Sequence, residues 1–296
     1  MNLLKIKPLY DAFHEYAKVY SNKGADYSVT DLIKAPRIVR LFKRYSTEIK
    51  REVDIVSQLG SFRGTAIHEQ FRKLLWKVVQ KSGTDDYMIE TRLWDRINGR
   101  RISGAIDVLY KTSLYDFKTT SVWKKIYGDT MEWENQLNLY AFLLFIINQP
   151  VKDLGVIAWY QDFDKMKAMN DKEYPKFPME LIPIELWDTE DQKNYMFDCI
   201  DRHKACELLP DAELPLCTSG DMWAKEDSWA IYKLTKAGKI PARASRVLKS
   251  MEAATKYIGG KDGYKIVERK GARVRCEDWC DVNKWCSQWK EYCDSK

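Results

Sequence analysis

The clearest pattern in the chain is a helical repeat of apolar residues over 62–81. Successive apolar positions there lie mostly three or four residues apart, which places them on one face of an α-helix. They are Ile67, Phe71, Leu74, Leu75 and Val78. The spacing predicts a helix that buries this stripe, with His68 at the border of the stripe.

Two helices are expected nearer the N-terminus. An amphipathic pattern predicts the first over 8–20. The second is predicted over 32–41, where Ser28 or Thr30 can serve as the N-cap and Pro36 interrupts the helical hydrogen bonds.

Strands and helices alternate in the middle of the chain. Runs of β-branched and aromatic residues predict strands over 87–94, 101–110, 114–119, 154–160 and 179–187. Asn98-Gly99 is a turn signal that joins the first two strands in a hairpin. A helix over 132–147 is apolar on all sides in its second half, which predicts burial against a sheet. Asp188 or Thr189 can cap a further helix that reaches position 208.

This order of elements predicts an α/β domain over 1–215, with a mixed β-sheet flanked by helices. Residues 216–296 are expected to form a smaller α/β lobe. Its predicted elements are a helix over 251–257, a break at Gly259-Gly260 and a strand over 264–267.

Composition fits a folded protein without membrane spans. Hydrophobic residues make up 45% of the chain and aromatic residues 13%, which is enough for a large core. The longest apolar run, 139–147, is far shorter than the roughly 20 residues that cross a bilayer. The N-terminus lacks the apolar segment of a signal peptide. We therefore expect a cytoplasmic protein without a membrane partner.

Positive charge is concentrated toward the C-terminus. The net charge of the whole chain is +6, but between Ala224 and Arg275 fourteen lysines and arginines stand against five acidic residues, a local excess of +9. Such a segment is either a surface that contacts phosphates or a solvated lysine-rich face. Charge alone does not separate the two.

Four of the seven cysteines, Cys276, Cys280, Cys286 and Cys293, fall within the last 21 residues. In a chain without a secretory signal, this clustering favours metal ligation over disulfides. Cys217 is the expected fourth ligand beside the first three, with Cys293 as its substitute. Four thiolates suit either an iron-sulfur cluster or structural Zn²⁺.

A hairpin at Lys111-Thr112 sets the register of two carboxylates. A two-residue turn there pairs Tyr110 with Ser113. Counting outward along the antiparallel ladder places Asp107 directly opposite Asp116, with Cβ atoms about 4.5 to 5.5 Å apart. Lys-Thr is a poor sequence for such a turn, so a longer loop with a shifted register is the alternative.

Lys118 lies two residues beyond Asp116 and is expected on the same sheet face. The two carboxylates repel by about 3 kcal/mol at an effective dielectric of about 20, and a divalent cation such as Mg²⁺ or Mn²⁺ offsets this repulsion. Lys118 could then favour a hydroxide nucleophile and stabilise charge on a phosphate. The alternative is a surface ion pair between Asp107 and Lys118, worth about 0 to 1 kcal/mol. The hairpin alone does not decide between them.

Two further motifs flank this hairpin: Gly64-Thr-Ala-Ile-His68 upstream and Gln136-Leu-Asn-Leu-Tyr140 downstream. With them, residues 29–140 resemble the PD-(D/E)XK nucleases of the RecB-like exonuclease type, in which these elements occur in the same order. The resemblance returns at Cys217 and the terminal cysteines, as in phage exonucleases and CRISPR-associated RecB-like nucleases. It implies a restriction-endonuclease-like core with a small C-terminal cysteine-cluster lobe.

The resemblance also implies a role for each residue of the site. His68, Asp107 and Asp116 correspond to metal ligands, and the carbonyl of Phe117 to a backbone ligand. Lys118 corresponds to the catalytic lysine. The acidic residue usual in the family's third motif is replaced here by the aromatic Phe117.

Gln136 and Tyr140 are four residues apart and share a helix face, and the resemblance implies that they position the substrate. The cysteine cluster resembles the iron-sulfur staple of helicase-associated and CRISPR-associated members, which favours a four-iron cluster over zinc. The implied cofactors are therefore Mg²⁺ or Mn²⁺ at the catalytic site and a structural cluster in the lobe.

The implied activity is hydrolysis of DNA by an exonuclease in recombination, repair or phage DNA processing. The expected substrate is DNA that has a free end or is single-stranded, and a recombination or helicase protein is the expected partner. The alternative is a DNA-end-binding recombination accessory protein that keeps the fold without cleaving. A third interpretation treats the cysteine lobe as an independent zinc interaction module.

Overall fold

The computed structural model describes residues 24–51 and 55–295, which form two compact units. The first contains residues 24–39 and the described part of 45–209, and the second contains 40–44 and 210–295. The helix predicted over 8–20 lies outside the described residues.

The first unit is built around a mixed sheet. The path through this sheet is β1 (Tyr27–Ser28), β3 (Arg100–Tyr110), β4 (Ser113–Thr120), β5 (Asp153–Tyr160) and β6 (Met179–Ile184), with β2 (Tyr87–Ile97) paired to β3. The pairs β1–β3 and β4–β5 are parallel, and the remaining pairs are antiparallel. The predicted α/β class, with a mixed sheet flanked by helices, is confirmed.

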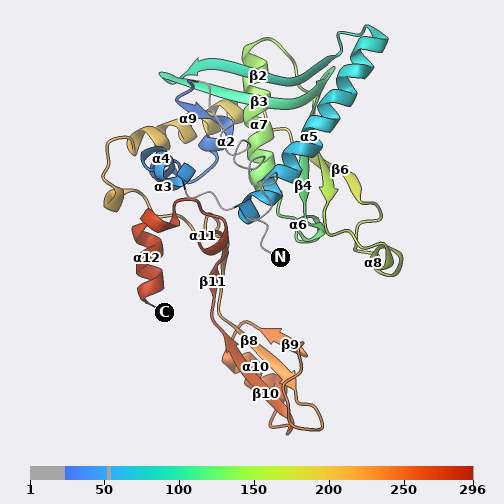
Figure 1. The fold of residues 1–296 in the computed structure, drawn as a ribbon, viewed down its shortest axis with the longest axis vertical. Helices are drawn as coiled ribbons and strands as arrows, with labels where there is room; N and C mark the ends of the chain where they lie inside the picture. The colour runs from blue at the N-terminus through green and yellow to red at the C-terminus, as the bar shows by residue number, and fades with distance from the viewer. Residues whose placement is uncertain (1–23, 52–54, 296) are drawn as a thin grey trace. The chain divides into compact units, whose positions relative to one another are not determined.

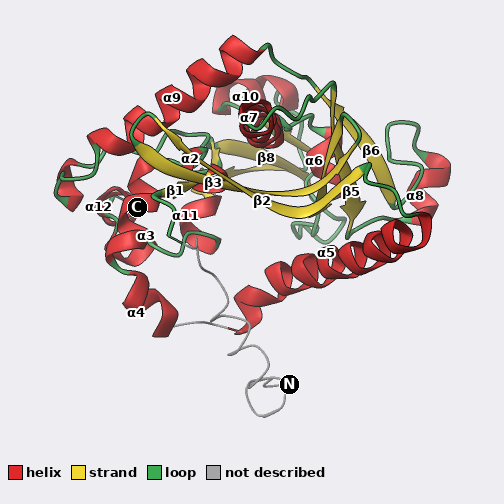
Figure 2. Cartoon of the chain, turned by 90° about the horizontal axis from the view of Figure 1, so that it is seen from above, coloured by secondary structure: helices red, strands yellow, loops and turns green. Residues whose placement is uncertain are grey.

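Helices lie on both faces of this sheet. Figures 1 and 2 show α7 (Met131–Ile146) against one face and α5 (Ile55–Ser82) across the other. The helix α9 (Thr189–Ala205) packs against α7, and Asp188 caps it as predicted. Leu137, Leu139 and Leu144 of α7 are almost fully buried, so the burial predicted for this apolar helix is confirmed.

The helix α5 extends the predicted helix at its N-terminus, but the predicted burial of its apolar stripe is wrong. None of its side chains from 60 to 82 is buried, and those of Leu74 and Val78 are 48% and 47% exposed. Phe71 stacks on Phe117 of the sheet with ring centroids 4.6 Å apart. The helix thus contacts the sheet along a narrow strip, since Ile67, Phe71 and Leu75 are half-buried whereas the other two stripe residues are exposed.

The single helix predicted over 32–41 is replaced by two. Ser28 caps α2 (Val29–Leu32), since its hydroxyl accepts from the backbone N–H of Asp31 at 3.1 Å. The next helix, α3 (Pro36–Arg44), begins at the proline. Proline has no N–H to donate and fits the first helical position, so it starts a helix here instead of interrupting one.

Two tight turns fix the register of β2, β3 and β4. Asn98 and Gly99 have φ values of 47° and 74°, the left-handed conformation that a two-residue hairpin turn requires. At the next turn Lys111 has φ of 55°, and Tyr110 pairs with Ser113 as predicted. The longer loop considered for Lys111-Thr112 is therefore excluded.

The other predicted strands and helices of the first unit occur close to their expected bounds, although β6 ends three residues early, at Ile184. This unit also contains α4 (Ser46–Arg51), α6 (Val122–Ile126) and α8 (Lys165–Asn170). In the part of the chain that the structure describes, no helix is long and apolar enough to cross a membrane.

The second unit contains short elements. They are η2 (Asp211–Glu213), β7 (Ala224–Lys225), β8 (Ser228–Lys233), β9 (Arg246–Leu248), α10 (Met251–Ile258), β10 (Tyr264–Arg269), β11 (Ala272–Arg273), α11 (Val274–Asp278), η3 (Asn283–Trp285) and α12 (Ser287–Asp294). The strand β8 lies between β9 and β10, α10 packs on this small sheet, and β7 pairs with β11. The helix predicted over 251–257 and the strand over 264–267 are confirmed, and Gly259 ends α10.

Candidate active site

The candidate active site lies where β3 and β4 separate. The ladder between these strands ends at Val108–Tyr115, one step before the predicted pair of Asp107 and Asp116. Beyond that point β4 pairs with β5, while β3 pairs with β2 and β1. Side chains from α5 and α7 approach this opening, so the site is formed by two helices and three strands.

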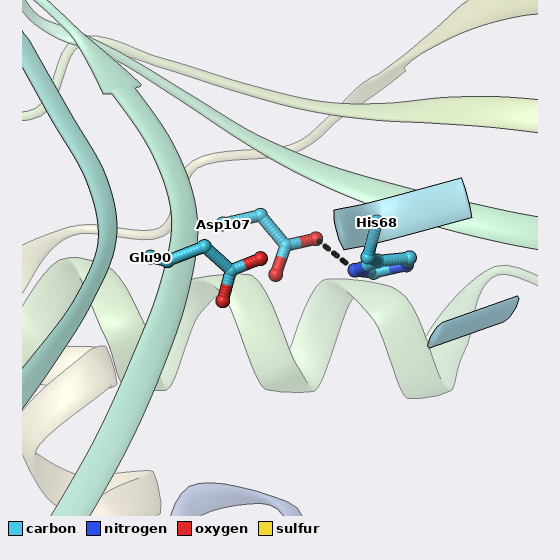
Figure 3. Close-up of side chains that lie close together, drawn as sticks. All are labelled: His68, Glu90 and Asp107. Atoms are coloured by element: carbon cyan, nitrogen blue, oxygen red, sulfur yellow. Dashed lines mark ion pairs between the residues drawn. The ribbon is translucent and has the colours of Figure 1, made fainter. Parts of the chain in front are cut away.

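His68 of α5, Glu90 of β2 and Asp107 of β3 converge on the opening, as Figure 3 shows. One ligand atom from each residue lies within 4.8 Å of those of the other two. His68 Nδ1 is 3.4 Å from Asp107 Oδ2, and the backbone N–H of Phe117 donates to the same oxygen at 2.7 Å. An imidazole nitrogen with carboxylate oxygens is a donor set that suits a divalent cation.

Sequence reasoning missed Glu90. Its φ is 47°, a left-handed value that is uncommon for a residue with a side chain, and such strained backbone clusters at functional sites. The ladder pairs on either side keep the β2–β3 register, so Glu90 stands opposite Asp107. Counting outward from the turn at Asn98-Gly99 would have identified this position.

Asp116 and Lys118 of β4 are joined to α7. Lys118 Nζ lies 2.7 Å from Asp116 Oδ2 and donates to Gln136 Oε1 at 3.0 Å. Gln136 Nε2 donates to Tyr140 Oη at 3.1 Å and lies 3.3 Å from Asp116 Oδ1. The Asp116 side chain is only 4% exposed, and its Oδ2 accepts no hydrogen bond of good angle. The charge of the Lys118 ammonium therefore stabilises Oδ2 of Asp116.

Gly104 allows α7 to approach the sheet beside this network. A Cβ at position 104 would lie 2.8 Å from Cε1 of Tyr140 and 2.9 Å from Cδ1 of Leu143. Real side chains do not come this close. A glycine in β3 is therefore required for α7 to place Tyr140 and Leu143 this close to the sheet.

Two acids of the site, Asp107 and Glu90, carry raised pKa values. Burial raises the pKa of Asp107 well above its ordinary value, and the charge of Asp116 raises it further, while the N–H of Phe117 opposes the shift. Burial also raises the pKa of Glu90. The protein alone thus stabilises these two carboxylates poorly, and a bound cation would supply the missing stabilisation.

The pKa of His68 is lowered, which favours the neutral imidazole, and the pKa of Lys118 is raised, which favours the charged ammonium. Burial lowers the pKa of His68, and the charge of Lys118 acts in the same direction against that of Asp116. Neutral imidazole is the form that binds metal ions. Burial would lower the pKa of Lys118, but the adjacent Asp116 outweighs it, so that pKa is raised and the ammonium persists.

A groove of about 430 Å³ gives access to this group. It is lined by Gly64, Thr65, His68, Glu69, Arg72 and Glu90. A hydrogen bond with the backbone of Phe117 acts to raise the pKa of the His68 imidazole. Of the predicted metal ligands, His68 and Asp107 converge with Glu90, whereas Asp116 lies in the adjoining network with Lys118, Gln136 and Tyr140.

The predicted cysteine ligands lie in the second unit. Cys217 exchanges two backbone hydrogen bonds with the side chain of Gln288, at 2.8 and 2.9 Å, which joins position 217 to α12. Burial raises the pKa of Cys217 to about 12, with contributions from Asp221 and from the other three predicted ligand thiols. Cys293 is exposed. Among the described residues only the His68 group has three ligand atoms within 4.8 Å, so the sulfur atoms are more widely spaced.

Neither a protein-family model nor a curated protein matches the sequence. The crystal structure of SSO0001 aligns with 66% of this chain and 85% of its own, at 19% identity and a TM-score of 0.45. The alkaline exonuclease LHK-Exo from Laribacter hongkongensis aligns with 59% of this chain and 89% of its own, at 16% identity and a TM-score of 0.31. Its complex with dAMP gives the same coverage and identity at 0.32. Similarities of this size do not support a conclusion about function.

Proposed function

We propose that the protein is a DNA nuclease that depends on a divalent metal ion. The observation that carries this proposal is the convergence of His68, Glu90 and Asp107 within 4.8 Å, next to the buried ion pair of Asp116 and Lys118. Acidic ligands beside a fixed cationic side chain suit the hydrolysis of phosphodiesters, whose transition state gains negative charge.

His68, Glu90 and Asp107 would hold Mg²⁺ or Mn²⁺, with Asp116 and the Phe117 carbonyl as further candidate ligands. When bound, the ion supplies Lewis acidity to a phosphate oxygen and lowers the pKa of the attacking water. The raised pKa values of the two converging acids support this assignment, because a cation compensates for their burial.

Lys118 stabilises the negative charge that develops on the phosphate. Asp116 and Gln136 fix its ammonium group, and Tyr140 in turn fixes the amide of Gln136. A donor held in place before the reaction needs no reorganisation during it, and removal of one such donor slows catalysis by roughly 100- to 1000-fold.

The substrate in this proposal is DNA with a free end or an unpaired strand, and cleavage proceeds from an end. An open groove beside the metal group accommodates an extended chain better than a small enclosed molecule. Recombination, repair or phage DNA processing is the corresponding role, with a recombination or helicase protein as partner.

We further propose that Cys217, Cys276, Cys280 and Cys286 hold a four-iron cluster in preference to Zn²⁺. Cys217 and Cys286 are buried, and burial together with the charges of the other thiols raises the pKa of Cys217 and of Cys276, so these thiols become thiolates readily only when a metal binds them. Purified protein with stoichiometric iron and visible absorption is the expected result. Colourless protein with stoichiometric zinc would contradict it.

The activity is tested by incubating end-labelled linear DNA and covalently closed circular DNA with Mg²⁺, Mn²⁺ or a chelator. Wild-type protein should degrade the linear DNA in either metal, and Lys118→Ala should slow this by at least about 100-fold while binding persists. Lys111→Ala is the matched control, since Lys111 is an exposed lysine in the turn before the same strand. An accessory protein would bind DNA ends and cleave in no case.

A further inference from the structure

A second hollow lies along α5 and adjoins the groove of the candidate active site. It measures about 380 Å³ and is lined by Gln70, Arg72, Lys73, Leu74, Trp76, Lys77 and Gln80. Arg72 lines both hollows. A chain bound in the first could therefore continue along the helix into the second.

The surface of this hollow is positively charged. Between Gln70 and Ser82 the sequence contains Arg72, Lys73, Lys77 and Lys81 and no acidic residue. Glu69, next to the hollow, pairs with Arg72 and lies 3.4 Å from Lys73, whose side chain is still 59% exposed. The hollow itself is lined by three cationic residues, and this excess of positive charge attracts a polyanion and favours phosphate contacts.

Trp76 adds an aromatic face to these charges. Its side chain is 45% exposed. It lies one helical turn from Arg72, and Lys73 and Lys77 form the neighbouring row. An exposed aromatic ring among cationic side chains is the arrangement on which unpaired bases stack while their phosphates are neutralised.

We propose that this face of α5, from Arg72 to Lys77, binds an unpaired DNA strand beside the candidate active site. Trp76 stacks on a base, and the cationic side chains contact the phosphates. The inference rests on the proposed nuclease function, because it extends the substrate groove. With a rise of about 1.5 Å per residue, Trp76 lies about 12 Å along the helix from His68, so the strand is held close to the point of cleavage.

The charge pattern distinguishes this occupant from two others. In duplex DNA both faces of each base are already covered by neighbouring base pairs, so a duplex leaves Trp76 without a stacking partner. A protein partner would favour an apolar patch, whereas lysines are depleted at the centres of protein interfaces. Here the cationic rows run directly beside the tryptophan.

The test measures binding of a labelled oligothymidylate by fluorescence anisotropy, in a Lys118→Ala background in which cleavage of DNA is expected to be slow. Trp76→Ala should weaken binding by about 5- to 150-fold, which corresponds to the loss of one base stack, whereas Trp76→Phe should retain most of the affinity. Lys77→Gln should reduce the slope of log K against log salt by about 0.7. Alanine favours helices, and circular dichroism checks that α5 remains folded.

Val78→Ala is the matched control, because Val78 is an apolar residue of the same helix, 47% exposed and without a π face. Its affinity for the oligonucleotide should equal that of the parent. Unchanged binding by Trp76→Ala would overturn the inference, as would an equal loss of duplex binding. The inference would also be overturned if Trp76→Ala and Val78→Ala both lost self-association without any loss of DNA binding. That result would assign this face of α5 to protein contacts.

The binding measurement and the cleavage assay with wild-type protein together separate this inference from the nuclease proposal. If wild-type protein leaves DNA intact but Trp76→Ala still weakens binding to the single strand, the nuclease proposal fails and the strand-binding surface remains. If wild-type protein cuts DNA and Trp76→Ala binds normally, the strand-binding surface fails and the nuclease proposal remains.

Discussion

The two units of this protein are stabilised in different ways. All members of the main hydrophobic core lie between Tyr27 and Ile200, in the first unit. The second unit has fewer buried apolar side chains, and two of its buried side chains are the thiols of Cys217 and Cys286. Small domains with little core depend on cross-links or metals. We therefore expect packing to hold the first unit and a bound metal group to hold the second.

This difference explains where strain and buried charge are tolerated. The left-handed residue Glu90 and the buried Asp116 both cost free energy, and both lie in the unit with the large core. Packing around the sheet offsets these costs and fixes the side chains. In the second unit, the metal group that we propose would contribute to stability by binding the thiols.

The largest expected effect comes from Cys286→Ser. The variant should lose the bound metal and with it most of the stability of the second unit, since metal binding supplies roughly 10 kcal/mol in small metal-dependent domains. The exposed Cys293 provides the control, because Cys293→Ser should retain metal. Metal analysis and limited proteolysis report the outcome. If proteolysis of Cys286→Ser also cleaved the first unit, the two units would not be stabilised separately.

Gly104→Ala tests the packing of the first unit. A methyl group 2.8 Å from the Tyr140 ring should cost about 1 to 3 kcal/mol in urea unfolding, because a close-packed core relaxes little. Gly60→Ala is the control, since a Cβ at position 60 would meet no atom within 4 Å. Equal stability of the two variants would show that this part of the sheet is loosely packed.

His203 gives the first unit a pH dependence. Its ring is 2% exposed, with Nε2 3.3 Å from the carbonyl of Leu32. Burial lowers the pKa of His203 to about 4, and Arg202 acts in the same direction, while the Leu32 carbonyl and Asp31 oppose it.

Below pH 6.5 His203 binds a proton in the unfolded chain but stays neutral in the folded chain until about pH 4. The free energy of unfolding therefore falls between pH 6.5 and 4. The loss due to His203 at pH 5 should be about 2 kcal/mol. Urea unfolding at pH 7 and 5, compared between wild type and His203→Gln, measures it. An identical pH dependence in the two proteins would mean that His203 is not kept neutral by burial.

The smallest effect is expected at Glu90. Glu90→Gly should raise stability by about 1 kcal/mol, because glycine adopts the left-handed backbone without strain. It should also weaken Mn²⁺ binding. Glu90→Ala should weaken Mn²⁺ binding equally without the gain in stability. Thermal unfolding and Mn²⁺ titration separate the two effects, and unaltered Mn²⁺ affinity in both variants would remove Glu90 from the metal site.

Local signals in the sequence predicted most of the fold. The Asn98-Gly99 turn and the apolar helix over 132–147 occur as expected, because turn conformation and helix burial follow from neighbouring residues. The predicted burial of the apolar stripe on α5 was wrong because burial of this helix depends on distant residues. The spacing of the stripe established a helix, but the number of strands that face this helix is not encoded in its own repeat.

The sequence by itself determined the register that brings Asp107 close to Asp116 and places Lys118 beside Asp116, because hairpin turns and strand alternation are local properties. Only the tertiary structure decided that β3 and β4 part at this point, that α5 supplies His68, and that Glu90 joins the acidic group. These contacts connect elements far apart in the chain. They depend on how helices pack on the sheet, which no single segment specifies.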